Sequence, residues 1–562
     1  MKTDVWGVAL KKIVALALFC LLVAGCSQAA EPGNLDATKP LSQEQEEVVG
    51  NAEDDPEVTD DANPRPKVDF SSKAADPESC KIMENSNIYP AGTPVFDYTG
   101  RDEIKGDYKG NPAAFPFRPT VLPTSGELLV IMLKSEWADL PGTDDDSEYY
   151  ERNARTLEDF WSMATEGKLK VTVEIVDRWF TLAGSYLDFQ LTPEDEAQRA
   201  DTRPKKQALW DAIVDASDEL VDFTKVDVVL PAFPRSATVS REGPHDFNFD
   251  WNAAMYTEEG AIYDIAAAGD GFINFGDVWF YYAHEMGHML GIQHMGADYL
   301  GAIEAEYRAP WIVNGMAGFD VMGNQDGAIK TLSSWHRWLA GWLDDSQVRC
   351  LQSTQIEEEY FELFPINEIG APLEALVINL DETMNVVVES RRWDARFDRN
   401  IVHSRDGIIV YTVDAMLGPA QSNMKLISPR DITKILDVQG KFHREELDGN
   451  LCQGDTVRIA DLVIEATWVG DATDVVKVSR SDSWIDPRQD MLAKGEFNQI
   501  SNGCVFGELE DLFYLEKVDP EWLDTKRGLR SSYWSEMGYI PLPESRASSG
   551  KENESDESSS QG

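Results

Sequence analysis

The sequence is short of positive charge. Its 562 residues include 50 Lys and Arg against 100 Asp and Glu, which gives a formal net charge of −50. Nucleic acids and anionic membrane surfaces are bound through basic patches, so this composition argues against both as partners. The excess of carboxylates favours solubility and suits hydrated cations, which makes calcium a possible ligand. Asp144, Asp145 and Asp146 could bind it, although a solvated acidic loop is the favoured interpretation of this run.

A hydrophobic run long enough for a membrane-spanning helix is also missing at the N-terminus. The run Ile13–Gly25 has 13 apolar or small residues, whereas a spanning helix needs about 20. With Lys11 and Lys12 before it, the run fits a secretory signal peptide. It ends in Leu-Val-Ala-Gly-Cys26, which resembles the lipobox of bacterial lipoproteins. We therefore predict a lipoprotein-type signal peptide at 1–26, lipid attachment at Cys26, and an outer-membrane or cell-surface location. The alternative is an ordinary cleaved signal and free secretion.

Cysteine is scarce, and none of the six forms a CxxC pair, so a thiolate zinc site is not expected. Once the signal peptide and Cys26 are set aside, four remain: Cys80, Cys350, Cys452 and Cys504. An even number in an oxidising compartment predicts disulfides, with three possible pairings. Cys80 could alternatively cap a metal as a thiolate, but a disulfide is the favoured interpretation.

The chain divides by composition into six segments. Residues 31–66 hold eleven acidic residues and no aromatic, so 27–79 is predicted to be a disordered acidic tether. Residues 80–345 alternate strand and helix patterns, which is an α/β order. Residues 346–480 are short β-branched runs separated by turns, typical of a β-sandwich. Residues 481–540 stay unassigned, and 541–562 are predicted to be a disordered tail.

Periodicity and turn signals place the elements. In the first region they predict strands at Gly126–Leu133, Lys168–Trp179 and Val226–Leu230, and helices at Tyr149–Thr165, Pro204–Val221 and Asp277–Gly291, the last with Asp277 as a candidate N-cap. In the second region they predict strands at Tyr360–Pro365, Ala375–Leu380, Asn385–Glu389, Gly407–Val413, Thr456–Ile459, Leu462–Trp468 and Asp474–Val478.

Histidine is rare as well, yet three of the seven lie in the stretch His-Glu-Met-Gly-His-Met-Leu-Gly-Ile-Gln-His at 284–294. On a helix, His284 and His288 lie one turn apart on one face and can bind zinc together. Gly291 allows a left-handed turn that brings His294 to a third ligand position. Three neutral ligands leave one position open, which is typical of catalytic rather than structural zinc.

Glu285 follows His284 directly, so it points about 100° around the helix and is not predicted to be a ligand. We interpret it as the general base that activates a zinc-bound water. The composition makes a chance occurrence of the whole pattern rare. Two other interpretations remain open: a buried helix that happens to carry histidines, and a zinc site without catalysis.

The pattern HExxHxxGxxH resembles that of the metzincin zinc peptidases, which also have a methionine turn beneath the metal. Met322, in Gly318-Phe-Asp-Val-Met-Gly323, is the candidate for that methionine. The Tyr that some metzincins carry two residues later is replaced by Asn324. The oxyanion-stabilising residue therefore stays open, with Tyr299, Tyr307 and His336 as candidates.

Further stretches resemble the immune inhibitor A family of secreted bacterial metallopeptidases. The similarity spans about 125 to 480 and includes Phe160–Leu169, Phe319–Asn324 and Ser333–Leu343. The resemblance implies a secreted, calcium-stabilised endopeptidase with a metzincin-like α/β catalytic domain, followed by the β-sandwich-like domain. We expect a zinc-dependent endopeptidase that acts on extracellular proteins or peptides and touches the membrane only through its lipid. The alternative is a surface adhesin or glycan-binding lipoprotein with a non-catalytic zinc site.

Overall fold

The computed structural model describes residues 65–68, 74–83, 113–117, 122–189, 203–235, 254–268, 278–292, 316, 319–322, 331–392, 397, 406–416, 423–427 and 450–487. All of these residues fall in one compact unit, Pro64–Gly562. The described part combines β-sheets with a few helices, so the predicted mixed α/β class is confirmed.

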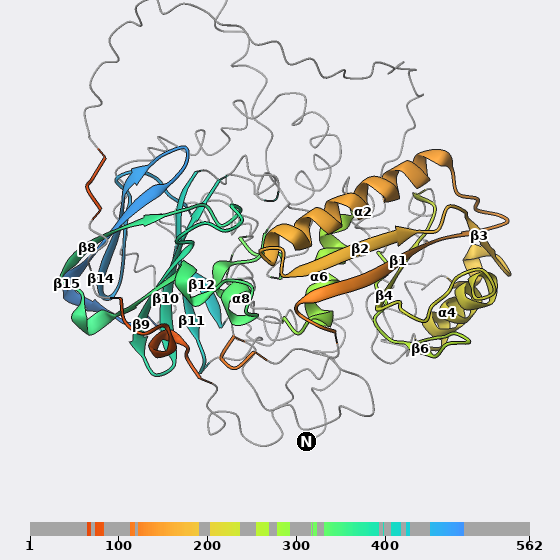
Figure 1. Ribbon diagram of the computed structural model, residues 1–562, viewed down its shortest axis with the longest axis horizontal. Coiled ribbons are helices and arrows are strands. Elements are labelled where there is room, and N and C mark those ends of the chain that lie inside the picture. Colours follow the sequence, from red (N-terminus) through yellow and green to blue (C-terminus); the bar gives the residue numbers. More distant parts are fainter. Residues whose placement is uncertain are drawn as a thin grey trace, which may run out of the picture. The chain divides into compact units, whose positions relative to one another are not determined.

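A parallel sheet organises the first half of the described chain (Figure 1). Its central strand, β1 (Gly126–Trp137), pairs in parallel with three others, β2 (Leu169–Ile175), β3 (Phe180–Leu182) and β4 (Val228–Ala232). The strand predicted at Lys168–Trp179 was too long, because the chain leaves the sheet after Ile175 and re-enters it at Phe180.

Helix α2 (Asp144–Ala164) connects β1 to β2 and begins earlier than predicted. Thr143 and Asp146 form a capping box, in which each side chain bonds the other residue's backbone N–H. Asp144 and Asp145 occupy the first helical turn, where negative charge is favoured by the helix dipole. The acidic run at 144–146 therefore starts a helix instead of forming a loop.

The two faces of the parallel sheet are buried against different helices. Because side chains alternate along a strand, β1 sends one set to each face. Leu128, Val130 and Met132 join a core that also contains α2 and the helix α6 (Trp279–Met289). Ile131 and Leu133 join a second core that contains α4 (Arg203–Ser217).

Shorter elements surround this sheet. Val229 of β4 bridges in parallel to Ile265, just beyond a two-stranded hairpin. These elements are η2 (Tyr186–Phe189), β5 (Met255–Tyr256) and β6 (Ala261–Ile262).

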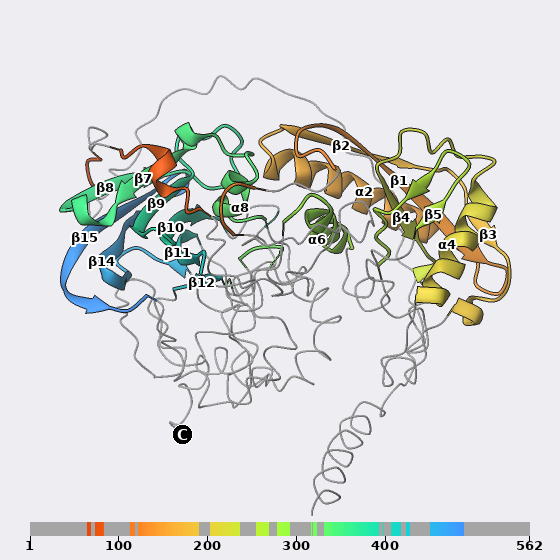
Figure 2. The ribbon, with the colours of Figure 1, turned by 90° about the horizontal axis from the view of Figure 1, so that it is seen from below.

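The second half contains two antiparallel-rich sheets (Figure 2). The larger has the order β12-β11-β10-β9-β7, with β13 paired to β11, and the smaller has the order β14-β15-β8. The larger sheet comprises β7 (Val348–Gln352), β9 (Ala375–Asp381), β10 (Met384–Arg391), β11 (Gly407–Asp414), β12 (Met424–Leu426) and β13 (Asn450–Leu451). The smaller comprises β8 (Glu358–Leu363), β14 (Thr456–Val469) and β15 (Asp474–Ile485). The short helices α8 (Ser334–Leu339) and η5 (Asp345–Gln347) precede β7, and η6 (Ser353–Gln355) lies between β7 and β8.

The larger sheet is buried on both faces, which explains its continuous apolar strands. Val386 and Val388 face a core shared with the smaller sheet. Val387 and Tyr411 face the core that contains α2 and α6. The core that contains α2 and α6 therefore includes residues on both sides of position 345. Through it, the larger sheet packs directly against the part of the chain that carries the predicted zinc helix.

Two predicted strands, Thr456–Ile459 and Leu462–Trp468, are in fact one strand, β14. Ala460 interrupts the pattern with a positive φ of 51°, and the register with β15 shifts between Ala460 and Leu462. Despite this irregularity, β14 is one strand that continues across a break in the sequence pattern. β15 also continues to Ile485, into the segment that was left unassigned.

The end of the predicted tether lies along these sheets. Arg65 pairs with Glu362 of β8, and the backbone N–H of Ala75 donates to the carbonyl of Cys350 at 2.9 Å. Cys80, at the end of η1 (Pro77–Cys80), forms a disulfide with Cys350. The prediction of disulfides is thus confirmed for Cys80 and Cys350, and Cys452 is disulfide-bonded as well.

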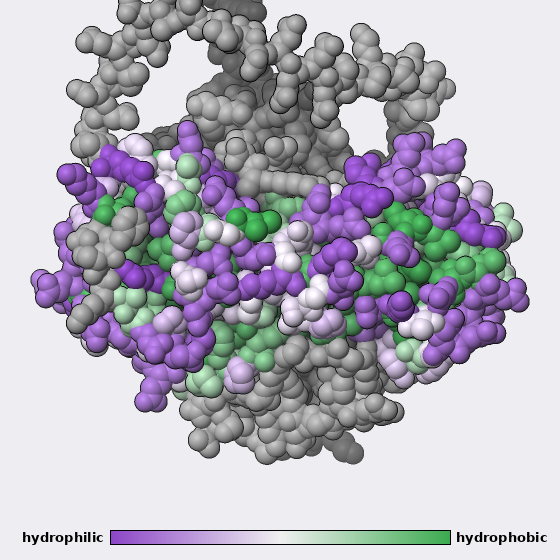
Figure 3. Space-filling model, in the orientation of Figure 1, coloured by the Kyte–Doolittle hydropathy of each residue, from purple (hydrophilic) through white to green (hydrophobic). Residues whose placement is uncertain are grey.

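Hydrophilic side chains cover most of the described surface in view (Figure 3). This matches the charge excess of the sequence. Among the described residues, no helix has both the length and the apolar character needed to cross a membrane.

Candidate metal centre

Helix α6 carries two of the predicted ligands and the predicted base. His284, Glu285 and His288 are all buried, with 2%, 6% and 3% of their surface exposed. The imidazole rings of His284 and His288 lie edge to face, with their centroids 4.7 Å apart. The one-turn spacing therefore brings the two rings together, as the helical pattern predicted.

Backbone carbonyls fix the tautomer of both rings. Nδ1 of His284 lies 2.7 Å from the carbonyl oxygen of Val321, and Nδ1 of His288 lies 2.9 Å from that of Ile292. A carbonyl can only accept, so each Nδ1 donates its hydrogen. In a neutral imidazole, Nε2 then holds the lone pair, which is the form that binds a metal.

The turn after α6 orients His288. Gly291 has a positive φ of 105°, as predicted for the end of this helix. Its N–H donates to the carbonyl of His288, and the N–H of Ile292 donates to that of Gly287, both at 2.9 Å. These two bonds form a Schellman motif, and they place the carbonyl of Ile292 where it accepts the hydrogen of His288 Nδ1.

Met322 packs directly against the same helix. A Cβ added to Gly287 would lie 2.5 Å from the sulfur of Met322, so the Met322 side chain would have to move to admit an alanine at this position. Val321, the neighbour of Met322, supplies the carbonyl that orients His284. The turn predicted to lie beneath a metal thus contacts α6 through both a side chain and a backbone group.

Asp320 holds this turn to α8. One carboxylate oxygen accepts from the N–H of Met322 at 2.8 Å, and the other from the N–H of Ser333 at 2.7 Å and from Nδ1 of His336 at 2.9 Å. Burial alone raises the pKa of Asp320, but the charge and hydrogen bond of His336 and the bonds from Ser333 outweigh it and lower the pKa. His336, one of the oxyanion candidates, thus bonds the turn through Nδ1.

A side chain that the sequence did not point to caps the start of α6. Oδ1 of Asn153, in α2, accepts from the N–H of Val278 at 2.7 Å and from that of Trp279 at 2.9 Å. The N-cap residue Val278 has no side-chain cap of its own, and the predicted cap Asp277 lies outside the described residues. No local signal could reveal this cap, because Asn153 lies 125 residues away from Val278.

The remaining candidates are not brought together in the described part. His294, Tyr299, Tyr307 and Cys26 all lie outside it. Within the described residues, no group of three or more His, Cys, Asp or Glu could hold a metal ion. His284 and His288 supply a suitable pair of donors, and a third ligand has to come from elsewhere, as the pattern predicts for His294.

Two other metal roles considered for the sequence find different partners. Cys80 is in a disulfide with Cys350, so it does not cap a metal as a thiolate. Asp146, the candidate for calcium with Asp144 and Asp145, accepts bonds from Thr143 and forms an ion pair with Arg235 at 3.5 Å. Its carboxylate is committed to the helix cap.

Comparison with known proteins gives no assignment. No family model and no curated protein matches the chain.

Proposed function

We propose that the protein is a zinc-dependent endopeptidase. The observation that carries the proposal is the pair of imidazoles on α6, each held by a carbonyl at Nδ1 so that Nε2 bears the lone pair. Buried histidines with a purely structural role need no common tautomer and no shared face. A metal that binds both rings needs both.

His284 and His288 would hold the zinc, with His294 as the proposed third ligand. Bound zinc supplies Lewis acidity towards a scissile carbonyl and a water molecule. Glu285, next to the ligands and outside their face of the helix, takes a proton from the attacking water. It then delivers this proton to the leaving amine, which completes the hydrolysis of the peptide bond.

A metzincin-like arrangement is part of the proposal. The contact of Met322 with Gly287 supports it, because it places a methionine turn against the helix of the ligands. Burial of Glu285 supports the general-base role, since its carboxylate is largely shielded from bulk solvent. The resemblance to immune inhibitor A-type peptidases agrees with this assignment, and it adds calcium as a possible stabilising ion.

The location and partners follow from the sequence. A lipid on Cys26 would hold the enzyme at the outer membrane or cell surface, with 27–79 as the connection and free secretion as the alternative. Extracellular proteins or peptides would be the substrates. The net charge of −50 argues against nucleic acid as a partner.

Hydrolysis of casein and of a mixed peptide library by the purified protein tests the proposal. We expect endoproteolytic products that vanish with a chelator and return with zinc. A protein that binds zinc but leaves every peptide intact would instead be the adhesin or glycan-binding lipoprotein with a non-catalytic site.

A further inference from the structure

The turn that carries Met322 is held by residues from two other elements. Arg391, the last residue of β10, donates from Nη2 to the carbonyl of Phe319 at 2.7 Å. The start of α8 is the second element. There the N–H of Ser333 and Nδ1 of His336 donate hydrogen bonds to Asp320, which belongs to the turn. Arg391, Ser333 and His336 are all buried, so their bonds to the turn are shielded from water.

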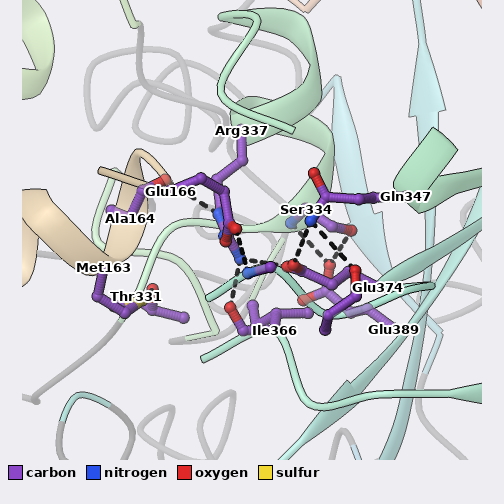
Figure 4. Close-up of polar contacts among 12 residues, drawn as sticks. Met163, Ala164, Glu166, Thr331, Ser334, Arg337, Gln347, Ile366, Glu374 and Glu389 are labelled. Carbon is purple, nitrogen blue, oxygen red and sulfur yellow. Dashed lines mark hydrogen bonds and ion pairs between the residues drawn. The ribbon is translucent and has the colours of Figure 1, made fainter. Parts of the chain in front are cut away.

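Glu389 joins Arg391 to the start of α8, and Figure 4 shows how it lies next to Ser334. Its Oε1 accepts from Nε of Arg391 at 2.8 Å. Its Oε2 accepts from the N–H of Ser334 at 2.9 Å, from the hydroxyl of Ser334, and from the hydroxyl of Tyr411 at 2.9 Å. One buried carboxylate therefore fixes both Arg391 and the first turn of α8.

The path from these residues to the metal ligand is short. Phe319 and Asp320 are followed directly by Val321, whose carbonyl accepts the hydrogen of His284 Nδ1 at 2.7 Å. A shift of the turn would move this carbonyl and release the imidazole from the orientation that presents Nε2. Groups that orient a ligating histidine in this way commonly change metal affinity 10- to 100-fold when they are removed.

We propose that Arg391 and Asp320 are positioning residues of the metal centre, which act on His284 through the turn 319–322. The larger β-sheet is then a structural part of this centre and not a separable binding module. The inference rests on the proposed function only in its premise that α6 binds zinc.

A neighbouring ion pair offers a matched control. Arg392 pairs with Asp474 at 2.9 Å, and both residues are buried. Asp474, like Asp320, accepts several bonds, among them one from Ser390 at 2.7 Å. No bond links this pair to the turn 319–322 in the described residues. Equivalent substitutions of the two arginines and of the two aspartates should weaken the fold to a similar extent, but only those of Arg391 and Asp320 should affect the metal.

The experiment compares Arg391→Lys with Arg392→Lys, and Asp320→Asn with Asp474→Asn, in the full chain. The zinc dissociation constant is measured by competition with a chromophoric chelator, and the cobalt(II)-substituted proteins are compared by their visible absorption. We expect Arg391→Lys and Asp320→Asn to bind zinc about 10-fold or more weakly and to change the cobalt spectrum. Both control variants should keep the wild-type affinity and spectrum.

Unfolding of the metal-free variants shows whether each is folded under the conditions of the titration. If Arg391→Lys does not fold, the comparison of Asp320→Asn with Asp474→Asn decides. The inference is overturned if the test variants keep wild-type zinc affinity, or if the controls lose as much. A wild type that binds zinc without cleaving peptides would reject the proposed function but leave this inference standing, whereas a wild type that binds no zinc would reject both.

Discussion

The sulfur of Met322 lies against the backbone of Gly287, which stands between His284 and His288 in α6. The close approach explains why a helix interior keeps a glycine, which by propensity costs about 1 kcal/mol relative to alanine.

Gly287→Ala should therefore destabilise the protein despite the better helix former. Overpacking of a core costs about 1–3 kcal/mol, which exceeds the propensity gain of about 1 kcal/mol. Chemical denaturation of Gly287→Ala, Met322→Ala and the double variant measures this. We expect Met322→Ala to lower the free energy of unfolding by less in the Gly287→Ala background than in the wild type. Strictly additive losses would show that the two residues do not press on each other.

Asn153→Ala should loosen the start of α6. It leaves the N–H groups of Val278 and Trp279 without their acceptor, and loss of a helix cap costs about 1–2 kcal/mol. Asn153→Asp is the matched variant, because it keeps the accepting oxygen and loses only the bond that Nδ2 donates to Tyr149. We expect the free energy of unfolding to fall for Asn153→Ala and to recover in large part for Asn153→Asp. Equal losses in the two variants would contradict the cap.

Glu374 should make stability depend on pH. It shares the guanidinium of Arg337 with Glu166, as Figure 4 shows, and all three residues are buried. Burial raises the pKa of Glu374 to about 8, in spite of the charge of Arg337 and with a further contribution from Glu166. In the unfolded chain the pKa is near its ordinary value of 4.5.

The sign follows from proton binding. Between these two pKa values the folded protein holds a proton on Glu374 that the unfolded chain has lost. Stability from this group is therefore complete below about pH 4.5 and declines by up to about 1.4 kcal/mol per pH unit as the pH rises towards 8. Glu374→Gln mimics the neutral form, so it should flatten this decline in denaturation curves recorded between pH 5 and pH 8. The exposed Glu382→Gln should leave the slope as it is, and a wild-type slope in Glu374→Gln would rule the explanation out.

Cys26→Ser should release the protein from the membrane fraction, because it removes the thiol that would carry the lipid. Cys20→Ala, in the same apolar run, serves as the control and should stay anchored. Fractionation followed by mass spectrometry of the N-terminal peptide detects both the location and the lipid. A Cys26→Ser protein that remains in the membrane would disprove lipid anchoring at this residue.

Sequence patterns within a few residues predicted those features of the fold that depend only on neighbouring residues. The left-handed end of α6 at Gly291 follows from glycine alone, and the spacing of His284 and His288 follows from the helical period. The start of α2 also has a local signal, the capping box of Thr143 and Asp146, which precedes the apolar periodicity that begins at Tyr149.

Other features depend on tertiary contacts that no sequence window contains. Asn153 caps α6 from another helix, and Arg391 reaches the turn at Phe319 from a different sheet. The order of strands in the larger sheet brings Glu389 next to α8, and short-range periodicity carries no information about such pairings. The contact of Arg337 with Glu374 is likewise a tertiary contact between distant parts of the sequence.

The most direct test of the account is Glu285→Gln. The substitution keeps the size of the side chain and removes its basicity, while His284 and His288 are untouched. We expect this variant to bind about one zinc per chain, as a three-ligand catalytic site does, and to unfold like the wild type. Its peptidase activity should fall by about 10² or more, the loss expected for a positioned acid–base group. His288→Ala is the contrasting variant and should lose zinc and activity together. Full activity in zinc-loaded Glu285→Gln, measured against the same peptide library as the wild type, would contradict the central claim.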